Sequence, residues 1–124
     1  MHEAGIAGNL IETAERHLQG VPHGPVRRLV VRLGELAGVN PEALDFAFEC
    51  LSPGTLVEGA RLEVERVPLT VACEACGGTT PVVDYVFRCG ACGADAVRVA
   101  TGRELEFVSI DVDDPVEEGA DASH

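Results

Sequence analysis

The hydrophobic residues in the first quarter of the chain follow two different spacings. From residue 4 to residue 19 they recur three or four positions apart, which predicts a helix whose buried face is formed by Ile6, Leu10, Ala14 and Leu18. Gly20 is a candidate C-cap, and Pro22 and Pro25 stop the helix. Residues 26–33 then alternate, which predicts a half-buried strand with an inner side formed by Leu29, Val31 and Leu33.

A second helix and two more strands follow from the same kind of pattern. Asn40 is an N-cap residue with proline at the first helical position, and the helix runs to about Leu51 with an inner face of Leu44, Ala47, Phe48 and Leu51. Cys50, within this helix, is expected to be a buried small hydrophobe. Residues 61–67 alternate with Leu62 and Val64 inward and Glu63 and Glu65 outward, and residues 104–112 form a third, less regular strand.

The segment between the last two strands, residues 69–100, has a different character. It holds four cysteines and many glycines but little that could form a core, so a metal must organise it. We therefore expect an α/β (α+β) fold, in which two helices lie on a three-stranded sheet and a four-cysteine zinc-ribbon module is inserted before the last strand. The α/β domain would comprise residues 1–68 and 101–113, and the module residues 69–100.

Charge and composition narrow the possible functions. The net charge of −12, from 21 acidic and 9 basic residues, disfavours nucleic acid as a partner because phosphates would be repelled. Acidic residues crowd residues 114–124, which we expect to form a disordered tail. The chain has no apolar run long enough for a membrane span and no signal-peptide pattern, so the cytoplasm is the expected compartment.

The four clustered cysteines are spaced as two metal-binding knuckles. Cys73-Glu-Ala-Cys76-Gly and Cys89-Gly-Ala-Cys92-Gly each let a tight turn aim two thiolates at one ion, and the glycine permits the backbone to turn beneath the sulfurs. Four thiolates form a closed tetrahedron that suits a structural zinc, with iron as the chemical alternative. Cys50 is expected to take no part in metal binding.

The amino terminus offers a second, different metal-binding pattern. The Met1 amine, the deprotonated His2 amide and the His2 imidazole can chelate one ion in a plane, and the Glu3 amide or carboxylate can complete the square. Such tetragonal nitrogen sets suit nickel(II) or copper(II). A histidine at position 2 is common by chance, so this pattern alone does not establish a site.

Several segments in a fixed order along the chain resemble the HypA/HybF family of hydrogenase nickel-incorporation proteins. They are Met1-His2-Glu3, Gly34–Val39, Pro41–Phe48, the two cysteine knuckles and Gly102–Leu105. The resemblance implies nickel on His2 with Met1 and Glu3 supporting, and zinc on Cys73, Cys76, Cys89 and Cys92. It also implies insertion of nickel into the nickel–iron hydrogenase large subunit, with a nickel-handling maturation GTPase as a partner and urease maturation proteins as alternative partners.

The sequence therefore favours a metallochaperone over an enzyme. It shows no nucleophile–base pair, no phosphate-binding glycine loop and no open catalytic metal site. The alternatives are a zinc-ribbon interaction module, which would need a basic face, and a rubredoxin-like electron carrier, which would need iron. A nickel site built from His17, His23 or the tail with His124 is the alternative to the amino terminus. Ala4-Gly5 differs from the larger Met-Ser pair associated with the family, so a looser start of the first helix is expected.

Overall fold

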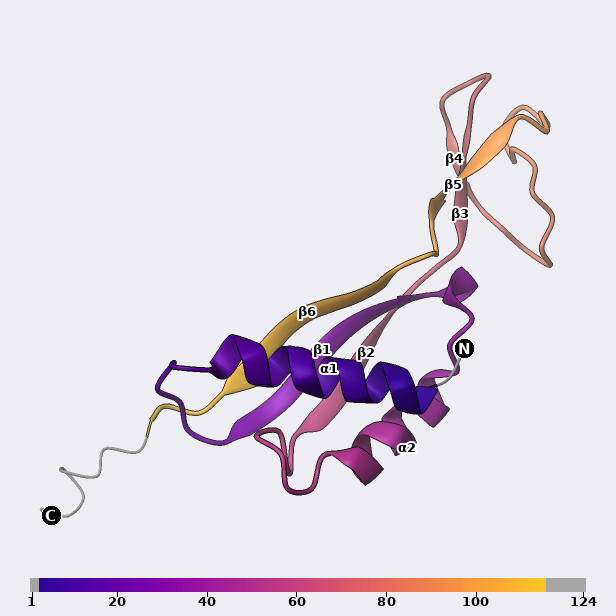
Figure 1. Ribbon diagram of the computed structural model, residues 1–124. Coiled ribbons are helices and arrows are strands. Elements are labelled where there is room, and N and C mark those ends of the chain that lie inside the picture. The colour runs from indigo at the N-terminus through magenta and orange to yellow at the C-terminus, as the bar shows by residue number, and fades with distance from the viewer. Residues whose placement is uncertain (1–2, 116–124) are drawn as a thin grey trace, which may run out of the picture. The chain divides into compact units, whose positions relative to one another are not determined.

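The computed structural model describes residues 3–115, which form two helices, one 3-10 turn and six strands (Figure 1). In chain order these are α1 (Glu3–Leu18), β1 (Val26–Gly34), η1 (Glu35–Ala37), α2 (Pro41–Leu51), β2 (Arg61–Val67), β3 (Thr70–Cys73), β4 (Thr79–Pro81), β5 (Val97–Thr101) and β6 (Leu105–Val112).

The described chain divides into two compact units. The first contains the described residues up to Val31, Val39–Val64 and the described residues from Phe107 onward. The second contains Arg32–Gly38 and Glu65–Glu106, and so includes all four clustered cysteines. None of the helices described is long and apolar enough to cross a membrane.

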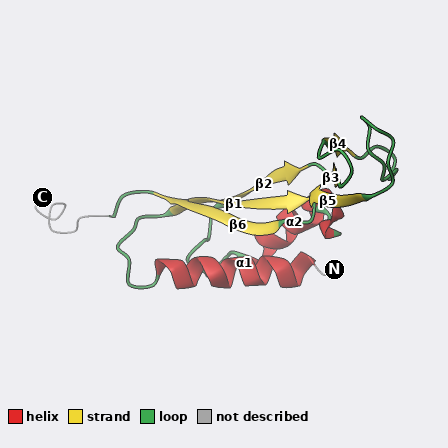
Figure 2. Ribbon diagram, turned by 90° about the horizontal axis from the view of Figure 1, so that it is seen from above, coloured by secondary structure: helices red, strands yellow, loops and turns green. Residues whose placement is uncertain are grey.

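The three strands that the alternating segments predicted form the larger sheet, and their order is β2-β1-β6. β6 is antiparallel to β1, because the amide of Gly34 donates to the carbonyl of Glu104 and the amide of Asp113 donates to that of Pro25. β1 and β2 run in the same direction, and both helices lie on one side of the sheet (Figure 2). A parallel pair needs a crossover connection, and η1 with α2 provides it.

The core of the first unit is formed by both helices and the inner face of the strands. Helix α1 buries the predicted stripe, and Gly20 follows it with a left-handed φ of 75°. The helix already begins at Glu3, so Ala4-Gly5 does not delay it. Its buried members pack with residues of β1, α2, β2 and the connection between α2 and β2. The core comprises Ala7, Leu10, Ile11, Ala14, Leu18, Val26, Leu29, Val31, Leu44, Phe48, Val57 and Leu62.

Helix α2 begins as predicted, but two of its residues lie differently from the expectation. The Asn40 side chain accepts hydrogen bonds from the amides of Glu42 and Ala43, at 2.9 and 3.1 Å. Cys50 is exposed, not buried, because it lies two positions after the buried Phe48 and therefore about 200° around the helix. Leu51 is 42% exposed because the helix ends there.

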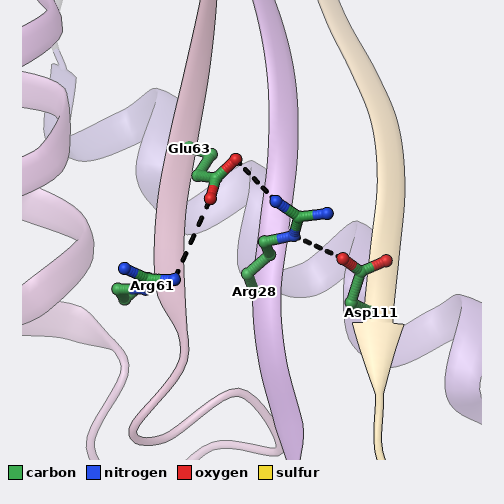
Figure 3. Close-up of polar contacts among 4 residues, drawn as sticks. All are labelled: Arg28, Arg61, Glu63 and Asp111. Atoms are coloured by element: carbon green, nitrogen blue, oxygen red, sulfur yellow. Dashed lines mark hydrogen bonds and ion pairs between the residues drawn. The ribbon is translucent and has the colours of Figure 1, made fainter.

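The outer side of β1 carries arginines that pair with acidic residues on both neighbouring strands. Arg28 donates to Glu63 of β2 at 2.8 Å and also bonds Asp111 of β6, while Arg61 lies 4.0 Å from Glu63 (Figure 3). Val30, on the same strand, is only 5% exposed, so β1 is more deeply buried than a half-buried strand. The aliphatic stems of long arginine side chains can cover such a position.

The second unit contains a small sheet that the sequence did not predict. Its order is β4-β3-β5 with antiparallel pairs, and Cys73 is the last residue of β3. Leu69 and Val71 are buried within this unit, at 3% and 1% exposure. The Glu35 carboxylate of η1 accepts a hydrogen bond from the amide of Leu69 at 2.7 Å.

Two glycines make this unit's close backbone contact possible. A Cβ atom on Gly34 would lie 2.2 Å from the carbonyl carbon and oxygen of Gly102. Gly102 itself has a φ of 121°, and a Cβ there would lie 2.9 Å from the Cα of Leu69. Side chains are therefore excluded from both positions.

Gly34→Ala should lower the free energy of unfolding by about 1–3 kcal/mol, because the added methyl group forces two backbone segments apart. Gly8→Ala is the matched control: Gly8 lies in α1 with open space around its Cα, so alanine should stabilise by about 0.5–1 kcal/mol. Urea unfolding of the metal-loaded variants measures both changes. Equal effects of the two substitutions would contradict the close contact at Gly34.

Candidate metal centre

The two cysteine knuckles have the same backbone structure. The amide of Cys73 donates to the carbonyl of Gly78 at 2.8 Å, and the amide of Gly77 donates back to the carbonyl of Cys73 at 2.9 Å. The second knuckle repeats both bonds at positions sixteen residues later, at 3.0 and 2.9 Å. Gly77 and Gly93 have φ values of 79° and 78°, so the glycine after each second cysteine takes the conformation the sequence predicted.

Backbone amides in each knuckle also point at the first cysteine's sulfur. The amides of Ala75 and Cys76 lie 3.3 and 3.4 Å from Cys73 Sγ. In the second knuckle the amides of Ala91 and Cys92 are both 3.4 Å from Cys89 Sγ. Such donors stabilise a thiolate, because they place positive ends of dipoles beside the negative charge.

The distances between the four sulfurs suit the tetrahedral coordination of one metal ion. All four Sγ atoms lie within 4.8 Å of one another, and two contacts between the knuckles, Cys73–Cys92 and Cys76–Cys89, measure 3.6 Å. Four sulfurs at the usual zinc–sulfur distance of about 2.3 Å stand about 3.8 Å apart. The observed spacing is close to that value and far longer than the ~2.05 Å of a disulfide. The residues therefore fit a tetrahedral metal ion.

The first cysteine of each knuckle has a lowered pKa, which favours its thiolate form. The amides of Cys92 and Ala91 hold the pKa of Cys89 well below its usual range, at about 6. The amide of Cys76 likewise lowers the pKa of Cys73. Both of these sulfurs are buried, with their residues 4% or less exposed.

The second cysteine of each knuckle behaves in the opposite way. The amide of Ala94 lowers the pKa of Cys92, but the thiols of Cys73 and Cys89 outweigh it and raise this pKa to about 12. The pKa of Cys76 is also raised. Four thiolates this close repel one another, so the cluster without a cation retains protons on its second cysteines. A bound divalent ion removes that repulsion and allows all four to ionise.

Of the predicted nickel ligands, the structure describes only part. Met1, His2 and His124 lie outside the described residues, so their arrangement stays a prediction. Glu3 is the first residue of α1, and its Oε2 accepts a hydrogen bond from the amide of Asn40 at 3.0 Å. The sequence marked Asn40 only as a helix cap. Its contact with Glu3 joins residues far apart in the chain, and no local pattern could have revealed it.

His17 and His23 form no second metal cluster with other described residues. The His17 ring stacks on Phe107 with centroids 5.7 Å apart, and its Nδ1 lies 2.8 Å from the carbonyl of Thr13. His23 Nδ1 lies 2.6 Å from the carbonyl of Gly24. Within residues 3–115, the four cysteines form the only group of three or more potential metal ligands. A nickel site on His17 or His23 therefore has no preformed ligand set in this region.

The fold and the cysteine cluster together define a class: a small α/β protein with an inserted four-cysteine metal-binding module. Residues 1–112 match the family model described as hydrogenase/urease nickel incorporation, metallochaperone, HypA. This match covers most of the chain, and the chain belongs to the HypA family of nickel-incorporation metallochaperones. The resemblance that the sequence motifs indicated is thereby confirmed.

Individual relatives support the same assignment. The hydrogenase maturation factor HypA of Geobacter sulfurreducens is 42% identical over 91% of this chain and 100% of its own length. That of Roseiflexus sp. is 43% identical over 95% of this chain and 97% of its own. A solution structure of a HypA protein has 26% identity and a TM-score of 0.66, covering 90% of this chain and 96% of that one.

A further structure supports the fold alone. The solution structure of the Ni metallochaperone HypA from Helicobacter pylori has 24% identity and a TM-score of 0.63. It covers 92% of this chain and 99% of its own.

Cys73→Ala should abolish binding of one metal ion per chain and expose residues 69–100 to proteolysis, because three thiolates leave the tetrahedron open. Cys50→Ala is the control and should retain full metal content, since Cys50 lies outside the cluster. Metal analysis and limited proteolysis measure both effects. Parental metal content in Cys73→Ala, or loss of metal in Cys50→Ala, would show that the ligands are assigned incorrectly.

Zinc uptake at pH 7 should release the protons held by Cys76 and Cys92, whose pKa values are raised in the cluster without a cation. Zinc affinity should consequently fall as the pH is lowered, since protons then compete for every thiolate. Titration calorimetry in buffers of different ionisation enthalpy counts the protons released. Zinc uptake without proton release would contradict the crowding of these thiols.

Proposed function

We propose that this chain is a nickel metallochaperone that binds nickel at its amino terminus and helps insert it into the large subunit of nickel–iron hydrogenase. The observation that carries the proposal is membership of the HypA family over residues 1–112, a range that includes Met1-His2-Glu3. The protein would act in the cytoplasm. It would serve as a carrier and not as an enzyme, because carriage needs only a site that exchanges its ion.

The proposed nickel ligands are the Met1 amine, the His2 amide and the His2 imidazole, with Glu3 supplying the fourth donor through its amide or carboxylate. The contact between the Glu3 carboxylate and the Asn40 amide supports a defined position for the residue that follows His2. Protons compete with nickel for the amine and the imidazole. A lower pH should therefore weaken nickel binding and release the ion.

We propose that the cysteine cluster holds one structural zinc. Four thiolates close the coordination sphere and leave no position for a substrate or water, which suits a structural ion and not a catalytic one. Bound zinc would supply the positive charge that the four thiolates need and would thereby keep both knuckles in place. Iron in the same cage would colour the protein red, whereas a zinc protein is colourless, so an absorption spectrum tests the electron-carrier alternative.

The proposed partners follow from the family. They are a nickel-handling maturation GTPase and the hydrogenase large subunit, with urease maturation proteins as alternative partners because the family description names both enzymes. The net charge of −12 supports protein partners over nucleic acid. The charge likewise weighs against the zinc-ribbon module of nucleic-acid-binding type.

Nickel binding should require both His2 and a free amino terminus. His2→Ala removes the imidazole, and one residue added before Met1 moves the amine out of the chelate ring; each change should weaken nickel binding about a hundredfold or more. Zinc content should stay the same in both, since the cysteine cluster is untouched. Calorimetric titration with nickel compares the two altered chains with the parent.

A chain truncated after Asp113 provides the control for the alternative site that includes His124. It should bind nickel like the parent if the amino terminus is the site. Parental nickel affinity in His2→Ala, together with lost binding in the truncated chain, would place nickel in the tail and overturn the proposed mechanism.

A further inference from the structure

Helix α2 presents an aromatic side chain to solvent on the face opposite its core residues. Phe46 is 67% exposed, whereas Leu44 and Phe48 on the same helix are at most 1% exposed. Cys50, one turn after Phe46, is exposed as well. A single exposed apolar side chain is common on protein surfaces, so the significance of Phe46 depends on the groups that surround it.

Three carboxylates surround Phe46 on the same helix. Glu42 and Glu49 lie four positions before and three positions after it, which places them on its own side of the helix, and Asp45 lies next to both at helical spacing. All three are exposed, and α2 has no basic residue. We call Glu42, Asp45, Phe46, Glu49 and Cys50 the α2 face.

The acidic residues of the α2 face differ from those that face the arginines of the sheet. In the first unit Arg28 is paired with Glu63 and Asp111. No ion pair involves Glu42, Asp45 or Glu49 in the part of the chain that the structure describes. The negative charge of the α2 face is therefore available to a partner.

The surface beside the α2 face is hollowed. A depression of about 180 Å³ lies between α2 and the start of β2, bordered by Asp45 and Glu49 on one side and by Ala60, Arg61 and Leu62 on the other. The guanidinium group of Arg61 also forms an ion pair with the carboxylate of Glu63, at 4.0 Å. An exposed phenylalanine beside a depression with acidic residues along its α2 side offers a partner both an apolar anchor and a space for side chains.

The α2 face also lies near the residue that follows His2. The amide of Asn40, which caps α2, donates to the carboxylate of Glu3. Phe46 lies six positions after Asn40, which is about 9 Å along a helix. A partner seated on this face would therefore lie close to the amino-terminal end of α1.

We propose that the α2 face is the docking surface for a partner protein that presents an amphipathic helix with apolar and basic side chains. Apolar residues of that helix would enclose Phe46, and its lysines or arginines would meet the three carboxylates. Self-association through this face is disfavoured, because a twofold interface would bring the same carboxylates together. The docking does not itself require nickel; only the position beside Glu3 connects it to the proposed function.

The test uses the full chain in its zinc-loaded form and a helical peptide of leucine and lysine as the probe. The peptide should bind the parent and shift the amide resonances of residues 42–50 in NMR spectra. A peptide with glutamate in place of lysine should not bind. Phe46→Ser should weaken binding about tenfold or more, as loss of a central aromatic anchor does. Val21→Ser, which removes another exposed apolar side chain at 51% exposure, should leave binding unchanged.

The charge requirement has its own matched pair. Glu42→Gln combined with Glu49→Gln should weaken binding about three- to tenfold at low salt, and the difference should shrink as salt is added. Glu12→Gln combined with Glu74→Gln makes the same change in net charge elsewhere and should have little effect. Equal effects of the two pairs, or of Phe46→Ser and Val21→Ser, would overturn the proposal.

Two further measurements separate this proposal from others. Sedimentation of the parent protein should show no dimer formed through the α2 face. A parent dimer that becomes monomeric in Phe46→Ser would mean that a second copy of the chain occupies this face, and would overturn the proposal of a basic partner. Nickel titration of Phe46→Ser should give the parental affinity. If the parent itself fails to bind nickel while the peptide results hold, the proposed nickel function fails and the docking surface stands.

Discussion

Mutual repulsion among four sulfurs is the constraint on which the second unit depends. The cluster holds thiols 3.6 Å apart across the two knuckles, and backbone amides already favour the thiolate form of Cys73 and Cys89. The same crowding raises the pKa values of Cys76 and Cys92, so full ionisation awaits a cation. A bound metal ion would offset this repulsion, and the four cysteines would then hold the two knuckles together.

The two units are consequently stabilised by different forces. The first unit buries a continuous set of aliphatic side chains and Phe48 between its helices and strands, which is the usual hydrophobic source of stability. The second buries fewer apolar side chains and depends on its cluster of four cysteines, on short strands and on the close contact of Gly34 with Gly102. Removal of metal should therefore affect the second unit first, because its other contacts are few.

The cysteine cluster and the proposed nickel site are suited to different tasks. Four cysteines on two turns would close the coordination sphere of an ion, and a closed site of this kind suits a structural ion. The proposed amino-terminal site consists of donors at the very start of the chain, followed by Glu3 and its bond to Asn40. The placement of an exposed aromatic residue with acidic neighbours on the helix that Asn40 caps is consistent with exchange of cargo through a partner protein.

The sequence by itself determined the two helices, the three strands of the larger sheet and the family, because these rest on local periodicity, caps and short spacings. The two cysteine knuckles could be predicted for the same reason. Two residues between the cysteines and a glycine after them specify the turn without reference to the rest of the fold. The prediction of a buried Cys50 is wrong, because its position on the helix, two residues after the buried Phe48, places a small apolar side chain on the exposed side.

Only the tertiary structure decided which distant groups meet. The bond from Asn40 to Glu3, the pairing of Arg28 with strands on both sides, and the approach of Gly34 to Gly102 all join residues more than thirty positions apart. The small sheet β4-β3-β5 likewise depends on pairing between strands too short to show a pattern of their own. Such contacts are set by how the elements pack and register, which residue spacing along one chain does not encode.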